Sequence, residues 1–153
     1  MRVSIGSDHR GVHLKSRVDA LLREKGFDVD DVGTVGSESV DYPDFAAAVA
    51  HKVADGESDR GILICGTGIG MAIAANKVSG VRAAPCNDEH AAEMSRRHND
   101  LNVLCISADL LDDAPIERLI DLWMKTPFEA GRHARRVEKI SQIEHDAVQP
   151  VQH

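Results

Sequence analysis

Apolar positions along the chain fall into two alternating patterns. Short apolar runs predict buried β-strands, and apolar residues spaced three and four positions apart predict amphipathic helices. Strands are expected over residues 3–6, 27–32, 61–65, 81–84 and 103–107. The alternation of strand and helix is typical of a parallel sheet covered on both faces. The pattern therefore predicts a three-layer α/β/α, Rossmann-like fold with a five-stranded parallel sheet.

The expected helices lie between and after these strands. Asp88 suits the start of a helix that runs to about His98, and Asn99 suits its end. Two helices are expected after the fifth strand, one from about Pro115 and a C-terminal one from about His133. We expect residues 1–146 to form one domain and residues 147–153 to form a flexible tail.

Composition narrows the class of protein. The 153 residues, 42% of them hydrophobic, suffice for one domain with a sizeable core. The net charge of −7 argues against nucleic acid as a partner. Asp8 interrupts the N-terminus before any apolar stretch long enough for a signal peptide, and no later stretch approaches a membrane span, so a cytoplasmic protein is expected. The three cysteines lack the spacing of a zinc knuckle or a disulfide framework.

A glycine-rich loop, Cys65-Gly66-Thr67-Gly68-Ile69-Gly70, follows the third predicted strand. A dinucleotide-binding fingerprint beginning at Gly66 needs glycine where Met71 stands, and the Gly-Lys-Ser/Thr ending of a P-loop is missing. No arginine follows Cys65 before Arg82, which disfavours a thiol phosphatase. The loop is either a close-packed turn or a cradle for an oxyanion.

If the loop is a cradle for an oxyanion, the Cys65 thiol can have a chemical role. A helix N-terminus beside Cys65 favours the thiolate, which can act as a base. If this base removes a proton from carbon next to a carbonyl, negative charge builds on oxygen as an enediolate. Backbone N–H groups of the loop are suited to stabilise that charge.

Several motifs in order along the chain resemble the ribose-5-phosphate isomerase type B family, which includes galactose- and allose-6-phosphate isomerases. The matching segments are Gly6-Ser7-Asp8-His9-Arg10-Gly11, Asp41-Tyr42-Pro43, Cys65-Gly66-Thr67-Gly68, Ala74-Ala75-Asn76-Lys77, His98-Asn99-Asp100 and Gly131-Arg132-His133. The resemblance implies an aldose–ketose isomerase of the pentose phosphate pathway that works through a cis-enediol. It also implies that the enzyme needs no metal or organic cofactor and forms a homodimer or tetramer whose sites draw on two chains.

The resemblance also assigns catalytic roles. Cys65 is expected to be the base, because the position that carries a catalytic glutamate in some relatives is Met71 here. The Thr67 hydroxyl is expected to pass protons between the two substrate oxygens. His98 is expected to open the sugar ring, with Asp8 nearby to orient it.

Substrate contacts follow from the same resemblance. The residues expected to bind the sugar phosphate are His9, Tyr42, Gly66, Gly68, Gly70, Asn99, Arg132 and Arg136. Arg132 and Arg136 are four apart, so a helix projects them from one face toward a phosphate, and Arg135 is the surface member of this basic run.

One position departs from the family pattern. Many relatives carry an arginine near the substrate phosphate after the fifth strand, whereas this chain has Asp109. Arg10, beside His9, is the candidate for the missing positive charge. The expected substrate is D-ribose 5-phosphate, with another sugar phosphate as the first alternative and a non-catalytic sugar-phosphate sensor as the second.

Overall fold

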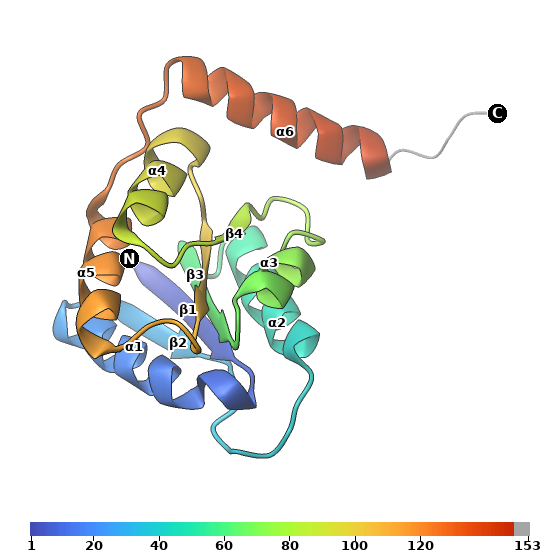
Figure 1. Ribbon diagram of the computed structural model, residues 1–153. Coiled ribbons are helices and arrows are strands. Elements are labelled where there is room, and N and C mark those ends of the chain that lie inside the picture. Colours follow the sequence, from blue (N-terminus) through green and yellow to red (C-terminus); the bar gives the residue numbers. More distant parts are fainter. Residues whose placement is uncertain (149–153) are drawn as a thin grey trace.

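The computed structural model describes residues 1–148, which contain a five-stranded, all-parallel sheet in the order β2-β1-β3-β5-β4 (Figure 1). The strands are β1 (Arg2–Ser7), β2 (Asp28–Asp31), β3 (Arg60–Cys65), β4 (Ala83–Pro85) and β5 (Val103–Ser107). The predicted α/β fold is confirmed, and β5 occupies the predicted residues. β4 is shorter and begins two residues later than predicted, at Ala83.

The helices agree with the expected order. They are α1 (Val12–Glu24), α2 (Tyr42–Ala54), α3 (Ile69–Ala75), α4 (Glu89–Asn99), α5 (Asp113–Lys125) and α6 (Arg132–Val148), with a 3-10 turn at His9–Gly11. Asp88 caps α4 as predicted, since its side chain accepts a hydrogen bond from the Ala91 N–H. The end of α4 was predicted one residue early: Asn99 is still helical, and Asp100 adopts the left-handed conformation, φ 46°, that ends the helix.

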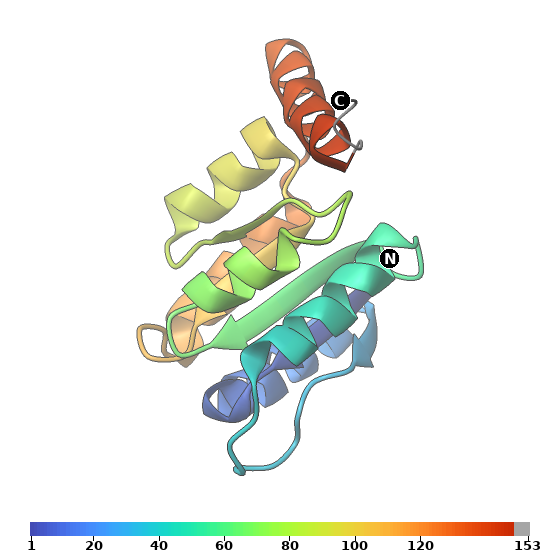
Figure 2. The same ribbon diagram turned by 90° about the vertical axis from the view of Figure 1, so that its right-hand side faces the viewer.

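The sheet separates two cores, because successive side chains of a strand point to opposite faces. On one face, Ile64 and Ile106 pack in the core that contains Trp123 of α5. On the other face, Leu63 and Cys65 pack with α2 and α3. Figure 2 views the molecule from the α2 and α3 side. Strand β3 is covered on both faces, as its continuous apolar run predicted.

Helix α6 lies apart from these layers and packs on α4 (Figure 2). Its apolar side chains Ile140 and Ile143 are 46% and 70% exposed. They line a groove of about 710 Å³, whose opposite side includes Val81 and Leu101. The apolar side of α6 is therefore open to solvent within one chain. Residues 147 and 148 continue α6, and the other residues of the expected tail lie outside the described part.

The sheet has two functionally different edges. Because all strands are parallel, β1, β3 and β5 all end at one edge, where Cys65 lies beside Ser107. Helix α4 begins after β4 at this carboxyl edge and returns to the opposite edge, where its last turn leads into the start of β5. Within residues 1–148, no helix is long and apolar enough to cross a membrane.

Candidate active site

The Cys65 thiol lies where β3 gives way to a three-residue loop. Cys65 is 5% exposed, and the Gly68 N–H donates a hydrogen bond to its Sγ at 3.2 Å. This backbone donor holds the sulfur in a fixed position at the end of β3. Thr67 is exposed, and its Oγ1 accepts a hydrogen bond from the Ile69 N–H at 3.2 Å, the first residue of α3. The hydroxyl proton of Thr67 thus remains available to a ligand.

Glycines at positions 68 and 70 allow the backbone to turn from the loop into the first turn of α3. Gly68 has φ 78°, in the left-handed region, and it sits against the Ile106 backbone, 3.2 Å from where a Cβ would lie. A Cβ at Gly70 would come within 2.6 Å of the Tyr42 ring. The Tyr42 ring therefore packs against the start of α3 at Gly70, and its contact with substrate stays a prediction.

Strand β5 holds the loop from its other side. The buried Ser107 hydroxyl donates to the Gly66 carbonyl at 2.6 Å, and the Asp109 N–H donates to the same oxygen at 3.1 Å. The Ala108 N–H donates to the Cys65 carbonyl at 2.9 Å. These bonds fix the loop before any substrate arrives, which is what an oxyanion cradle requires. Ser107 was not among the predicted site residues, although its place at a strand end was a usable signal.

Asp8 and His9 reach the same edge from β1. The Asp8 carboxylate caps the 3-10 turn by accepting from the Arg10 and Gly11 N–H groups at 3.0 and 3.2 Å. His9 Nδ1 accepts a hydrogen bond from the Val40 N–H at 3.2 Å. The neutral His9 ring therefore carries its proton on Nε2, where it can be donated to an anion.

Arg10 and Asp109 form an ion pair at the mouth of the loop. The Arg10 Nη2 donates to both Asp109 carboxylate oxygens, at 2.7 and 2.8 Å. The acid at position 109 is therefore matched by a guanidinium from position 10, which lies 99 residues away in sequence. No pattern along the chain signalled this contact.

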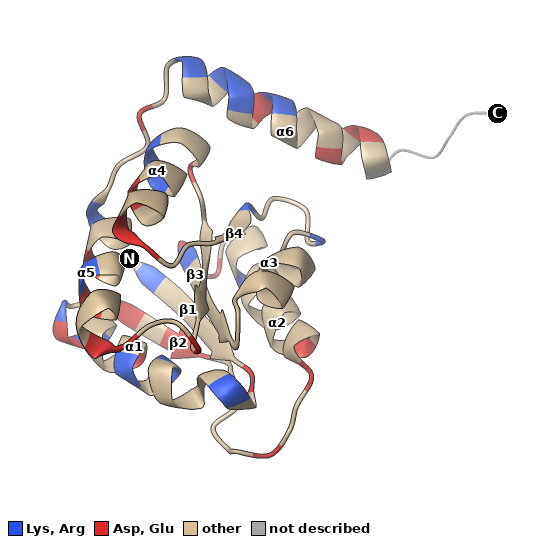
Figure 3. Cartoon of the chain, in the orientation of Figure 1, with Lys and Arg blue, Asp and Glu red and all other residues tan. Residues whose placement is uncertain are grey.

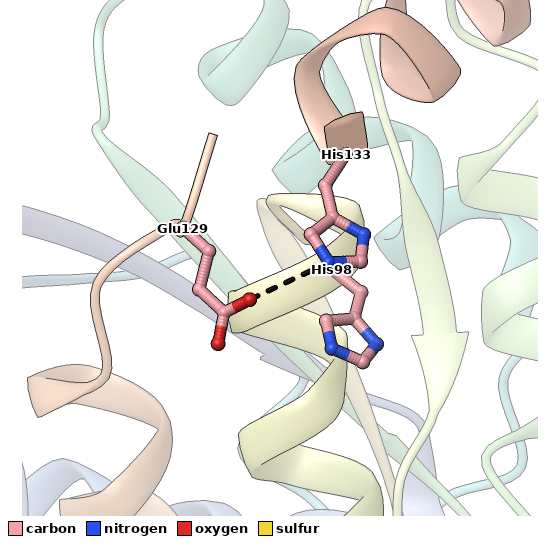
Figure 4. A group of neighbouring side chains, drawn as sticks. All are labelled: His98, Glu129 and His133. Carbon is pink, nitrogen blue, oxygen red and sulfur yellow. Dashed lines mark ion pairs between the residues drawn. The ribbon is translucent and has the colours of Figure 1, made fainter. Parts of the chain in front are cut away.

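The remaining predicted site residues gather at the opposite edge. His98, in the last turn of α4, stacks on His133 with ring centroids 4.1 Å apart and an interplanar angle of 10° (Figure 4). His133 is buried, and its Nε2 lies 3.4 Å from a Glu129 carboxylate oxygen. Burial lowers the pKa of His133, and the neighbouring His98 and Arg132 lower it further. The sequence marked His133 only as part of a matching segment and as the approximate start of the last helix, and the structure gives it a defined place beside His98.

Two arginines of α6 add positive charge near the stacked rings of His98 and His133. Arg132 and Arg136 are exposed on the first turns of α6, where Figure 3 shows the basic residues of the helix concentrated. Asn99 is exposed at the end of α4. His98 and Asn99 at the end of α4 and Arg132 and Arg136 at the start of α6 therefore lie on adjoining elements, and their roles stay predictions.

His98, Glu129 and His133 are also the residue types that bind transition metals, and their ligand atoms lie within 4.8 Å of one another. A metal ion lies in the plane of each histidine ring that binds it, along the nitrogen lone pair. The two rings here are stacked almost parallel, so their lone pairs lie in separate planes (Figure 4). This arrangement favours ring-on-ring packing over a shared metal.

The residues around Cys65 and the residues around His98 do not meet within one chain. Cys65 lies at the carboxyl edge of the sheet, level with the end of β5, whereas His98 precedes the start of β5 at the opposite edge. At about 3.3 Å per residue, the length of β5 separates these edges by roughly 13 Å. Asp8, on the Cys65 side, is therefore not beside His98 of the same chain.

The other two cysteines differ from Cys65. Burial raises the pKa of the Cys105 thiol well above its ordinary value, and it also raises the pKa of Cys86. Both thiols are kept protonated, so neither is a base at neutral pH.

A parallel sheet with a glycine loop and a buried thiol at its carboxyl edge is an arrangement typical of α/β enzymes, whose ligands bind at that edge. The model of the Ribose/Galactose Isomerase family matches residues 3–140. The chain belongs to this family and is an isomerase, as its motifs predicted.

Individual relatives agree over nearly the whole chain. Ribose-5-phosphate isomerase B of Escherichia coli is 46% identical over 143 residues, which cover 94% of this chain and 96% of the relative. D-erythrulose-4-phosphate isomerase of Pectobacterium atrosepticum is 40% identical over 146 residues, covering 95% and 96%. The structure of Clostridium thermocellum ribose-5-phosphate isomerase B superimposes with a TM-score of 0.94 at 50% identity, covering 96% of this chain and 99% of that one.

Proposed function

We propose that this enzyme interconverts D-ribose 5-phosphate and D-ribulose 5-phosphate through a cis-enediolate, with Cys65 as the base. The observation that carries the proposal is the Cys65 thiol itself, which receives a backbone N–H at 3.2 Å within a loop fixed by β5. Relatives that bear the name ribose-5-phosphate isomerase B, at 46% and 50% identity, support the choice of substrate.

Proton transfer at carbon is the central step. The Cys65 thiolate takes the proton from C2 of the open-chain aldose, and the electron pair of that C–H bond moves to leave negative charge on O1. Loop N–H groups stabilise this oxyanion. The thiol then returns the proton to C1, while Thr67 carries a proton from O2 to O1. The product is the ketose, and the thiolate is regenerated.

His98 prepares the substrate for this step. The sugar phosphate is mostly cyclic. His98 opens the ring by giving a proton to the ring oxygen as the bond between that oxygen and C1 breaks, while the C1 hydroxyl loses its proton to water and becomes the aldehyde. Asp8 balances the charge of that imidazole. His9, Arg132 and Arg136 bind the phosphate, and Asn99 and Tyr42 contact the sugar.

These roles require a second chain, because His98 and Cys65 lie at opposite edges of one sheet. We infer a homodimer in which the His98 group of one copy completes the Cys65 group of the other. The exposed Ile140 and Ile143 of α6, beside an open groove, support an interface there. Two such dimers can form a tetramer. The three cysteines are unpaired, which suits a reducing cytoplasm.

The first alternative function differs from the proposed one in the length of the sugar phosphate that the enzyme accepts. The relative named D-erythrulose-4-phosphate isomerase, at 40% identity, makes a tetrose phosphate the competing substrate. Purified enzyme should be assayed against ribose 5-phosphate, erythrulose 4-phosphate, allose 6-phosphate and galactose 6-phosphate. We expect the highest kcat/KM with ribose 5-phosphate. A higher value with another sugar would reassign the substrate, and phosphate-sugar binding without turnover would identify a sensor.

A further inference from the structure

The Arg10 guanidinium lies flat over Gly66. An ideal Cβ built on Gly66 would be 2.8 Å from Nη1, 2.9 Å from Cζ and 3.1 Å from Nε of Arg10. These three atoms belong to one planar group and lie at similar distances from the built Cβ. The Cβ position is therefore above the face of the guanidinium and not beside its edge. Glycine at position 66 thus lets a positive charge rest directly on the loop that follows Cys65.

Asp109 fixes this position from two directions. Its carboxylate accepts both hydrogen bonds from Arg10 Nη2, at 2.7 and 2.8 Å. Its backbone N–H donates to the Gly66 carbonyl at 3.1 Å, so the residue that orients the guanidinium is itself tied to the loop. Arg10, Asp109 and Gly66 therefore form one unit.

Part of the guanidinium remains available. Among residues 1–148, Arg10 Nε and Nη1 donate no hydrogen bond, and the Arg10 side chain is 56% exposed. A guanidinium has five N–H donors in a fixed plane, so Asp109 uses only those of Nη2.

We propose that Arg10 is a substrate-binding residue that contacts the phosphate group of the sugar phosphate, with Asp109 as the residue that positions it. This inference rests on the proposed function and adds a contact from the chain that supplies Cys65. Phosphate suits the geometry because its oxygens accept several planar N–H donors at once. The exposed ion pair alone would contribute little to stability, so holding the guanidinium over the loop is its main effect.

Substitution of Arg10 tests this contact with two readouts. For Arg10→Ala, we expect KM for ribose 5-phosphate and the Kd for inorganic phosphate, measured by isothermal titration, to rise roughly tenfold or more. We expect kcat to change less than about twofold, since uniform binding is lost. Arg118→Ala, which removes another exposed arginine from a long ion pair with Glu89, is the matched control and should change neither value. Should Arg10→Ala fail to fold, Arg10→Gln carries the same expectation.

Two results would overturn the proposal. Unchanged KM and phosphate Kd, with only a lower Tm, would make the Arg10–Asp109 pair a structural tie. A fall in kcat with an unchanged phosphate Kd would place Arg10 at the reacting carbons instead. If the wild-type enzyme turned over no sugar phosphate, the proposed function would fail, and the phosphate titration would still decide the role of Arg10.

Discussion

The imidazole ring of His98 lies on that of His133, with centroids 4.1 Å apart and an interplanar angle of 10°. Two stacked imidazoles disfavour protonation of both, because like charges would then be in contact. Burial and the nearby His98 lower the pKa of His133, so His133 is neutral at neutral pH. A neutral, buried His133 thus offers His98 a flat surface that fixes the direction of its ring.

Acid should destabilise the protein through His133. Its pKa in the folded state is below the ordinary value of 6.5, so the unfolded chain binds a proton more readily. The contribution of His133 to the free energy of unfolding is therefore fully present above pH 6.5 and is lost as the pH falls below that value. We expect His133→Asn to show a smaller loss of Tm between pH 7.5 and 5.5 than the wild type. His51→Asn, at an exposed position of α2, is the control and should keep the wild-type pH dependence.

Removal of the thiol should separate chemistry from binding. Cys65→Ala should reduce kcat by roughly 10²- to 10⁴-fold, the usual contribution of a general base, while the Kd for substrate stays within about threefold. Cys86→Ala removes a buried thiol whose pKa is raised, and it should retain activity. Single-turnover assays and equilibrium binding measure the two effects. Turnover at the wild-type rate by Cys65→Ala would rule out the thiol as base.

The arginines of α6 should not be equivalent. Arg132→Ala and Arg136→Ala should each raise KM roughly tenfold, because each loses a charge-assisted contact with phosphate. Arg135→Ala, between them in sequence and also exposed, should leave KM unchanged. Initial-rate kinetics on the three variants provide the comparison. Equal effects of all three would indicate a general influence of positive charge rather than two specific contacts.

The local features of the fold followed from the sequence. The apolar run of β5 predicted its residues, and the side chain of Asp88 predicted the start of α4, since both depend on neighbours along the chain. The short strand β4 was harder to place, because Ala83 to Pro85 carries little of the apolar pattern.

The sequence proposes which residues form the site, whereas their arrangement in space appears only in the structure. Glycines, a thiol and a threonine in one loop indicated chemistry near Cys65. The ion pair between Arg10 and Asp109 joins residues 99 apart, which no local pattern encodes. The separation of His98 from Cys65 depends on the direction in which α4 crosses the sheet, so it emerged only with the topology.

Complementation between two inactive variants tests the shared site most directly. Cys65→Ala and His98→Asn should be mixed, allowed to exchange subunits and assayed with ribose 5-phosphate. In a symmetric dimer whose sites combine both chains, random exchange makes half of the dimers mixed, and each mixed dimer has one intact site, so roughly a quarter of the wild-type activity should return. Mixing Cys65→Ala with the double variant Cys65→Ala/His98→Asn should restore none. Absence of recovery in the first mixture, with subunit exchange verified by mass spectrometry, would contradict a site built from two chains.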